Sequence, residues 1–426
     1  MQAFEKRRII LSCLSGNVLE WFDFAVYGYV ATTLAPLFFP TSSPFASLLL
    51  SYSVFALGFF ARPLGSIGFG YIGDRLGRKT ALVWSSFLMA IPTFCIGLLP
   101  TYEQIGIWAP ILLLLCRIFQ GLSVGGEYTG SFVYLVETAP KGEKGRMGCW
   151  ADIGCFLGTM MGTLSIALLT QTLSREAFTS YGWRIPFFAG ILLGVVGFFM
   201  RKSLRESNDF TKSPTIKHPI HHLLTKQRRL FFASIGLIAL NAMGFYMITV
   251  FIGNQTIALG KIPASEAYAL NAFALLCITF STFTIARFVD IYDAVKFYKI
   301  GCLTSAILAY PLFYSLVYGS MAMQIILMGL FSIAISFTFA PRSYFLVNTF
   351  SPATRFTAVA LCMSIANAVF GGMTPLVATT LIKESGIPIA PFIMIIIAAA
   401  ITWFAINVIS GEKSKTTHSN PLDKAA

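Results

Sequence analysis

Charged residues and long polar stretches are scarce in this chain of 426 residues. Asp, Glu, Lys and Arg make up only 12% of it, whereas 56% is hydrophobic and the mean hydropathy is +0.73. One soluble core cannot hide so much apolar surface, so a soluble globular protein is excluded. The longest polar stretch runs from residue 201 to residue 229, and the polar tail only from 412 to 426. No separate soluble domain is therefore expected.

Grouped cysteines and histidines are also missing. The eight Cys stand singly in apolar segments and form no C-x-x-C pair, which argues against disulfide and metal chemistry. The four His lie in the central polar stretch or the tail, and the group from His218 to His222 is interpreted as a solvated loop cluster that binds metal only adventitiously. The sequence contains no P-loop, nucleophile-base set or metal triad. We expect neither an enzyme nor a bound cofactor.

The chain is rich in apolar runs long enough to span a bilayer, which takes about 20 residues. We expect helices at residues 9–39, 45–72, 79–99, 105–139, 146–172, 183–202, 229–258, 264–290, 297–317, 320–350, 355–382 and 387–410. This pattern predicts an all-α, polytopic membrane protein with twelve transmembrane helices in two sets of six. The expected divisions are an N-terminal half at 1–200, a cytoplasmic linker at 201–228, a C-terminal half at 229–411 and a cytoplasmic tail at 412–426. In the fifth run, Gly154, Gly158 and Gly162 recur at four-residue steps and predict a close helix contact.

The net charge of +13 is explained by topology rather than by a nucleic-acid partner. Most of the 31 Lys and Arg flank the apolar runs on one side. The loops assigned to the other side contain only Arg175, Arg184, Lys261 and Lys383. Because basic loops remain in the cytoplasm, both termini are predicted to be cytoplasmic, and no nucleic-acid partner is expected.

The first apolar run contains two carboxylates near its middle, Glu20 and Asp23, roughly 17–21 Å from the start of the helix. The residues that share a helical face with Glu20 are Asn17, Phe24 and Tyr27. Charges at that depth are costly and need a cavity or a partner. A carboxylic acid that binds and releases a proton there would serve proton coupling, whereas one locked permanently to an arginine would be structural. We expect Glu20 and Asp23 to serve coupling or substrate binding.

The fourth run carries a cation and an amide at a similar depth. One of its helical faces collects Arg117, Gln120, Gly121, Val124 and Tyr128. Lipid cannot host such groups, so this face is expected to point inward and bind substrate. Arg117 is a candidate counter-ion for Glu20 or Asp23 and equally a candidate ligand for a substrate carboxylate, because guanidinium groups form forked hydrogen bonds to carboxylates.

Further charges lie within other apolar runs. Arg62, Glu127 and Asp152 are placed near the inner end of their helices, where they are predicted to form an inner gate. Static salt bridges between helices would explain the same three residues equally well. Arg342 lies in the tenth run and is either a substrate ligand or, more simply, an arginine that snorkels to the inner surface.

The stretch GYIGDRLGRK at residues 70–79 places glycines and charges between two apolar runs, which suits only a tight turn at a membrane surface. Its spacing resembles the signature loop of the major facilitator superfamily, whose members are secondary transporters. The resemblance implies two pseudo-symmetric six-helix halves with a substrate site between them. It also implies a conformational latch formed by Asp74, Arg75, Arg78, Glu137 and Arg146. A carboxylate such as Asp74 is favoured at the amino end of a neighbouring helix.

Longer stretches resemble the metabolite:proton symporter family within that superfamily. They are GNVLEWFDFAVYGY, ARPLGSIGFGYIGDRLGRK, IGIWAPILLLLCRIFQGLSVGGEYTG, YGWRIPF and SPATRFTAVALCMSIANAVFGG. Residues 93–130 look most like the proline/betaine permeases, which take up zwitterionic osmolytes with protons. The resemblance implies that Asn17, Glu20, Phe24 and Tyr27 line the translocation path. The chain lacks the long coiled-coil-forming tail of the osmosensory permeases, so osmotic activation of that kind is not expected.

The mixed charges of Glu20, Asp23 and Arg117 suit a zwitterion. The leading hypothesis is therefore a proton-coupled symporter of proline or glycine betaine that works by alternating access. Arg62 and Arg342, added to Arg117, keep open a second hypothesis, symport of a di- or tricarboxylate such as 2-oxoglutarate or citrate. A non-transporting membrane sensor is less favoured. The expected partners are a small-molecule substrate, protons and the lipid bilayer, with a monomer in the cytoplasmic (inner) membrane of a bacterium.

Overall fold

The computed structural model describes residues 3–202, 204–211, 219–258 and 264–418, which are almost entirely helical and contain no strand. Contacts between residues divide the chain into two compact units. The first unit consists of Met1–Pro219 and Pro352–Ser364, and the second of Ile220–Ser351 and Ile365–Ala426. The all-α prediction is thereby confirmed.

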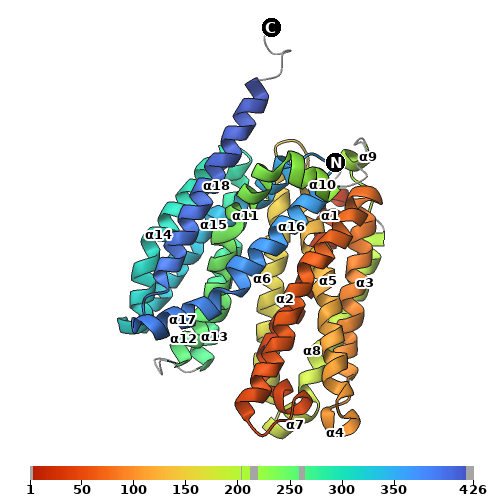
Figure 1. Ribbon diagram of the computed structural model, residues 1–426, viewed down its shortest axis with the longest axis vertical. Coiled ribbons are helices and arrows are strands. Elements are labelled where there is room, and N and C mark those ends of the chain that lie inside the picture. The colour runs from red at the N-terminus through yellow and green to blue at the C-terminus, as the bar shows by residue number, and fades with distance from the viewer. Residues whose placement is uncertain (1–2, 203, 212–218, 259–263, 419–426) are drawn as a thin grey trace. The chain divides into compact units, whose positions relative to one another are not determined.

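The first unit is a bundle of long helices, coloured red to yellow-green in Figure 1. Its elements are α1 (Ala3–Phe38), α2 (Pro44–Arg75), α3 (Arg78–Leu98), α4 (Tyr102–Ile105), α5 (Trp108–Glu137), α6 (Lys144–Thr172), α7 (Arg175–Ser180), the short turn Gly182–Arg184, α8 (Ile185–Lys202) and α9 (Asn208–Thr211). Helix α1 packs most extensively on α6 and also on α8, while α5 packs between α2 and α3. Most of α16 (Arg355–Ala366) also belongs to this unit.

The second unit, green to blue in Figure 1, contains the remaining helices. They are α10 (Pro219–Lys226), α11 (Arg228–Tyr246), α12 (Gly253–Ala258), α13 (Ala264–Val289), α14 (Ala294–Tyr318), α15 (Met321–Thr349), α17 (Thr374–Ser385) and α18 (Phe392–His418). The run expected at 229–258 is helical throughout but contains π-helical turns at Met247–Ile252, and the run expected at 355–382 contains a second π-helical segment at Asn367–Gly372. Such wide turns are frequent at functional sites. Helix α18 begins later than the expected residue 387 and continues to His418.

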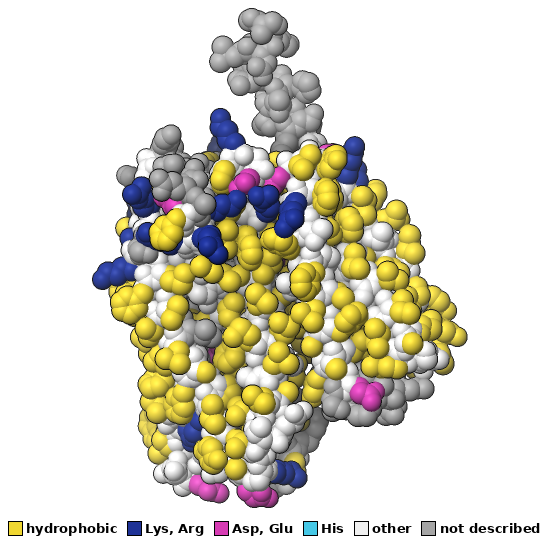
Figure 2. Space-filling model, turned by 180° about the vertical axis from the view of Figure 1, so that it is seen from behind, with side chains coloured by type: hydrophobic (Ala, Val, Ile, Leu, Met, Phe, Trp, Pro, Cys, Tyr) yellow, Lys and Arg dark blue, Asp and Glu magenta, His cyan; other side chains and the backbone are white. Residues whose placement is uncertain are grey.

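The surface of these helices is that of a membrane protein. Among the described residues, eleven helices are long and apolar enough to cross a membrane; the 32-residue α2, which packs along α5, is not one of them. Large apolar side chains such as Phe60 and Phe404 are more than two-thirds exposed. Figure 2 shows hydrophobic side chains over most of the face in view, with Lys and Arg concentrated toward one end. Apolar patches of this extent require lipid around them.

The glycine stripe of α6 brings α1 close, as its spacing predicts. A Cβ atom added at Gly154 would lie 2.8 Å from the Asn17 Cβ atom, one at Gly158 would overlap the Val18 carbonyl oxygen, and one at Gly162 would lie 2.8 Å from the Phe22 carbonyl oxygen. These contacts hold the segment of α1 that carries Glu20 and Asp23 directly against α6.

We expect Gly158→Leu to lower the midpoint of thermal unfolding of the purified protein, because overpacking a close contact costs about 1–3 kcal/mol. Gly68→Leu on α2 is the matched control, since a Cβ atom at Gly68 would meet nothing within 4 Å. Thermal unfolding followed by intrinsic tryptophan fluorescence measures both. Equal losses in the two variants would show that the α1–α6 contact does not carry the effect.

Candidate functional site

The two carboxylates of α1 have different surroundings, although each residue is only 1% exposed. Asp23 is held on both oxygen atoms. Arg117 Nη1 donates to it at 2.9 Å and Gln120 Nε2 at 2.8 Å, while Arg117 also donates to Gln120 Oε1 at 2.7 Å. Gln120 Nε2 lies 2.7 Å from Thr93 Oγ1 on α3. Of the two candidate counter-ions for Arg117, the structure therefore selects Asp23.

Glu20 is the carboxyl group without such a partner. Neither of its oxygen atoms has a hydrogen-bond partner among the described residues. Together with Phe24, Phe59 and Arg62 it lines a hollow of about 20 Å³, which is room for roughly one water molecule. The Arg62 guanidinium lies 4.1 Å from the Phe59 ring centre and 5.6 Å from that of Phe24. A buried ionisable group that has no hydrogen-bond partner among the described residues marks a functional position.

The other residues of the predicted substrate-binding face divide between the hollow and helix contacts. Gln120, Gly121 and Val124 of α5 line the hollow with Glu20 and Phe24. Three further members bond to neighbouring helices. Asn17 Nδ2 donates to the Ala151 carbonyl oxygen at 3.1 Å, the Tyr27 hydroxyl donates to the Ser51 carbonyl oxygen at 3.3 Å, and the Tyr128 hydroxyl donates to Asp152 Oδ1 at 2.8 Å. The Arg117 guanidinium also covers the Tyr27 ring at 4.3 Å.

A second charged cluster lies at the α2–α3 turn, centred on Arg78, which is fully buried. Its guanidinium donates to Asp74 Oδ1 at 2.9 Å, to Glu137 Oε1 at 3.2 Å and to the Pro352 carbonyl oxygen at 2.7 Å. Arg355 also donates to Glu137 Oε1, at 2.9 Å. Three of the predicted latch residues are thereby brought together within the first unit.

Asp74 also caps a helix, as expected from its charge. Its carboxylate accepts hydrogen bonds from the backbone N–H groups of Phe356 at 3.1 Å and Thr357 at 2.9 Å, in the first turn of α16. Negative charge is favoured at that end of a helix. The α2–α3 turn and the start of α16 are therefore linked by a carboxylate that also bonds Arg78.

The remaining two predicted latch residues lie outside this cluster. Arg75 bonds the Tyr71 hydroxyl, and its guanidinium covers the Tyr71 ring at 5.0 Å. Arg146 pairs with Glu143 at 3.2 Å, and Lys6 bonds the same carboxylate. The hydrogen bond from Lys6, reinforced by the charges of Lys6 and Arg146, holds the pKa of Glu143 below its ordinary value.

Glu206 is a residue of this region that the sequence pattern does not predict. Its carboxylate accepts from the backbone N–H groups of Arg78 at 2.9 Å and Lys79 at 3.2 Å, which begin α3. Gly77 precedes them with φ of +110°, and a Cβ atom there would overlap the Glu206 carboxylate. No local signal reveals this contact, because the two segments are more than a hundred residues apart in the chain.

Arg201 is a second residue that the sequence pattern does not place, because it stands at the start of the predicted basic linker. Arg201 is fully buried in the last turn of α8 and forms an ion pair with Glu127 of α5. The three predicted gate residues thus have different neighbours: Glu127 pairs with Arg201, Asp152 accepts from Tyr128, and Arg62 stacks on aromatic rings.

In the second unit, Arg342 is 2% exposed rather than extended to a surface, and its guanidinium lies 4.7 Å from the Phe339 ring centre. Its burial contradicts the simpler interpretation of a snorkelling side chain. The residues that the structure describes contain no group of three or more His, Cys, Asp or Glu able to hold a metal ion.

Solved structures of other proteins share this fold. The proton:xylose symporter XylE bound to 6-bromo-6-deoxy-D-glucose superposes with a TM-score of 0.75 at 17% identity, covering 96% of each chain. FucP, a major facilitator superfamily transporter in the outward conformation, gives 0.68 at 14% identity, covering 93% of this chain and 98% of the other. Helices of membrane-spanning length with buried charges at their centres, in this fold, define a polytopic membrane protein with the fold of the major facilitator transporters.

Sequence relatives narrow the class. A family model described as "Sugar (and other) transporter" matches residues 9–218. A proline/betaine transporter of Salmonella typhimurium is 32% identical over 435 residues, covering 98% of this chain and 85% of the relative. A glycine betaine/proline/ectoine/pipecolic acid transporter of Dickeya dadantii is 32% identical over 443 residues with the same coverage. A putative proline/betaine transporter of Staphylococcus aureus is 31% identical over 434 residues, covering 99% and 92%. The chain belongs to the metabolite:proton symporter family of the major facilitator superfamily, alongside these transporters.

Proposed function

We propose that the protein takes up a zwitterionic osmolyte, such as proline or glycine betaine, together with protons. The observation that carries this proposal is the contrast on α1 between Asp23, which is bonded on both oxygens, and Glu20, which is bonded on neither. Glu20 is assigned the coupling proton. Asp23 is assigned the task of holding Arg117. The names of the sequence relatives support the substrate class.

The surroundings of Glu20 suit a zwitterion better than a polycarboxylate. Arg62 offers a cation to a carboxylate group, while Phe24 and Phe59 offer ring faces, which attract quaternary ammonium groups. A dicarboxylate such as 2-oxoglutarate calls for a second cation, and Arg117 is already neutralised by Asp23. The hollow as described holds about one water, so solute binding requires it to widen during alternating access.

The charged cluster at the α2–α3 turn is assigned the role of a latch. Arg78 joins Asp74, Glu137 and the backbone at Pro352, so that opening this end of the protein must break several buried charge-assisted bonds. We further propose that this end faces the cytoplasm of a bacterium, with both termini on that side. The basic residues concentrated there favour that orientation.

The decisive experiment measures uptake of radiolabelled proline, glycine betaine and 2-oxoglutarate into proteoliposomes, with and without an inward proton gradient. We expect proline or betaine to accumulate only with the gradient, roughly tenfold for one pH unit at one proton per solute. Uptake that ignores the gradient would contradict proton coupling. Gradient-driven uptake of 2-oxoglutarate alone would assign the protein to the alternative substrate class.

A further inference from the structure

The Glu127–Arg201 ion pair is buried and separate from the cluster around Arg78, and the proposed coupling step does not use it. Glu127 is 1% exposed and Arg201 fully buried. The Glu127 carboxylate also accepts from Ser85 Oγ at 2.5 Å and Ser86 Oγ at 3.4 Å, both on α3. Desolvating two charges is expensive and adds little stability compared with an apolar contact, so a buried pair of this kind calls for a functional explanation.

The pair lies one helical turn from Glu20. A Cβ atom added at Gly16 would overlap both the Glu127 carboxylate and the Arg201 guanidinium, which places these groups directly against α1 at that residue. Gly16 precedes Glu20 by four residues, or roughly 6 Å along the helix. One or two water molecules are enough to connect carboxyl groups at that spacing.

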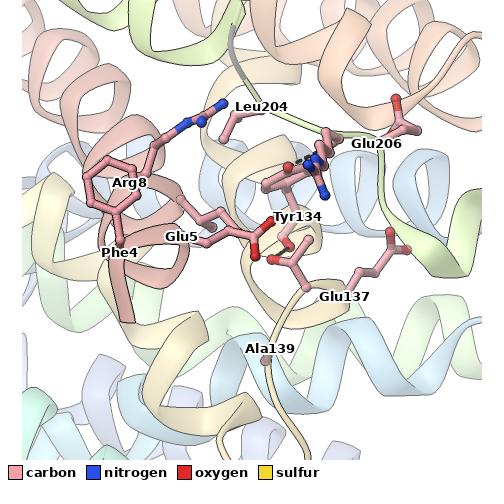
Figure 3. A pocket seen from close by; sticks show the side chains of 11 residues that line it. Phe4, Glu5, Arg8, Tyr134, Glu137, Ala139, Leu204 and Glu206 are labelled. Atoms are coloured by element: carbon pink, nitrogen blue, oxygen red, sulfur yellow. Dashed lines mark hydrogen bonds between the residues drawn. The ribbon is translucent and has the colours of Figure 1, made fainter. Parts of the chain in front are cut away.

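Beyond Glu127, the same α1–α5 contact leads to a cavity of about 800 Å³ near the amino-terminal end of α1. Ser131 of α5 follows Glu127 by one helical turn on the way to the cavity, and its hydroxyl donates to the Glu127 carbonyl oxygen at 3.1 Å. Tyr134, which lines the cavity, follows Glu127 by seven residues, or roughly 10 Å. Figure 3 shows Glu5 and Arg8 extending into this cavity from α1, opposite Tyr134 and Glu137. Glu20, Glu127 and the cavity thus follow one another along the contact between α1 and α5.

We propose that Glu127 is a second proton-binding station that passes the coupling proton from Glu20 to the cytoplasmic cavity. This inference rests on the proposed function and extends it by naming the release route. The proton leaves the Glu20 carboxyl group, crosses a bridging water and binds the Glu127 carboxylate; it then passes to water in the cavity, and Glu127 regains its negative charge. Glu127 ends as it began, Glu20 is left as a carboxylate ready for the next proton, and one proton is delivered to the cavity.

Arg201 has other hydrogen-bond acceptors that allow its ion pair with Glu127 to break and re-form. Besides Glu127 it donates to the Ser12 carbonyl oxygen at 3.1 Å, to the Leu82 carbonyl oxygen at 3.0 Å and to the Ser86 hydroxyl. These three acceptors keep the guanidinium in place while Glu127 is neutral. Its charge then draws the proton off again by restoring the ion pair. Arg201 is therefore a positioning residue.

Several helices around this part of α5 contribute polar or titratable groups near Glu127 or Glu20. They are Cys13 and Glu20 of α1, Arg62 of α2, Ser85 and Ser86 of α3, Tyr128 and Ser131 of α5, Asp152 of α6 and Arg201 of α8. Besides Glu127, the carboxylates of this set are Glu20, the proposed donor, and Asp152, which accepts from Tyr128. This leaves Glu127 as the station between Glu20 and the cavity.

The test compares accumulation with solute exchange in proteoliposomes that contain a trapped pH-sensitive dye. Removing one partner alone would leave a buried unpaired charge, so the informative variant is the neutral pair Glu127→Gln with Arg201→Gln. We expect it to exchange labelled for unlabelled solute at the wild-type rate, because exchange needs no net proton release. Gradient-driven accumulation is expected to vanish, and proton delivery recorded by the dye to slow roughly a hundredfold, the size of effect seen for one proton-transfer group.

Two further variants complete the test. Glu176→Gln removes an exposed carboxylate of α7 and is expected to behave as the wild type. Ser85→Ala removes a hydrogen bond from Glu127 but leaves both charges, and is expected to change the rate of proton delivery without affecting exchange. Full accumulation by the neutral pair would overturn the inference. So would a neutral pair that loses both exchange and accumulation, if Ser85→Ala delivers protons at the wild-type rate. If the wild type itself shows no proton coupling, the proposed function fails first, and the two failures are thereby distinguished.

Discussion

Glu20→Gln is expected to abolish gradient-driven accumulation of solute while exchange of labelled for unlabelled solute continues. Glutamine preserves the size and polarity of the side chain but cannot carry the proton. Because neither oxygen of Glu20 is bonded to a described residue, the substitution breaks no hydrogen bond of the fold. Uphill transport requires the solute to move with a proton, whereas exchange requires only that the loaded site face each side in turn.

The same assay separates Glu20 from Asp23. Asp23→Asn removes the charge that Arg117 neutralises, and a buried guanidinium without its carboxylate costs on the order of 3–5 kcal/mol. We therefore expect Asp23→Asn to impair exchange and accumulation together and to lower thermal stability. Glu176→Gln, in the exposed helix α7, is the neutral control. Normal accumulation by Glu20→Gln would move the coupling role to another carboxylate.

Arg78→Lys is expected to cause the largest loss among the conservative substitutions, even though it keeps the positive charge. Arg78 donates to Asp74, to both oxygens of Glu137 and to carbonyl oxygens at Gly73 and Pro352. Lysine has three donors in place of five and no planar fork. Each buried acceptor left without a donor costs about 1–3 kcal/mol, so the thermal midpoint and the initial uptake rate are both expected to fall.

Arg75→Lys provides the matched control from the same turn. Arg75 stacks on Tyr71 and bonds its hydroxyl, outside the cluster around Arg78. Its replacement is expected to leave uptake and the thermal midpoint near the wild-type values. Equal loss in the two variants would show that the charge of the turn, rather than the geometry of the Arg78 cluster, controls transport.

Several contacts within the first unit follow directly from residue spacing. The stripe of Gly154, Gly158 and Gly162 predicts the close approach of α6 to α1, and the carboxylate of Asp74 predicts a helix cap. Both predictions depend only on local chemistry, which a single segment carries. By contrast, spacing alone left two partners open for Arg117, because Glu20 and Asp23 lie within one turn of each other. The side-chain directions of α1 and α5 decide for Asp23.

The partners of charged residues at the ends of apolar runs are the contacts that the sequence predicts least well. Arg201 stands at the junction of α8 and a basic stretch, where sequence pattern favours a solvated cation, yet it is fully buried against Glu127. Glu206 lies in that same polar stretch and caps α3. Their partners belong to other helices. The periodicity of one segment does not predict which distant helix will contact that segment.

The sequence by itself determined that this chain is an all-helical membrane protein of the major facilitator type, since apolar run length, basic loops and the signature turn are properties of contiguous residues. Tertiary structure alone decided which buried charges face one another: Asp23 with Arg117, Glu127 with Arg201, and Glu20 with no hydrogen-bond partner in the part of the chain that the structure describes. The physical reason is that lipid offers no hydrogen-bond partners, so each helix must form its backbone hydrogen bonds within itself. Helices can therefore be predicted from the local sequence. The pairing of charges depends on how those finished helices pack together.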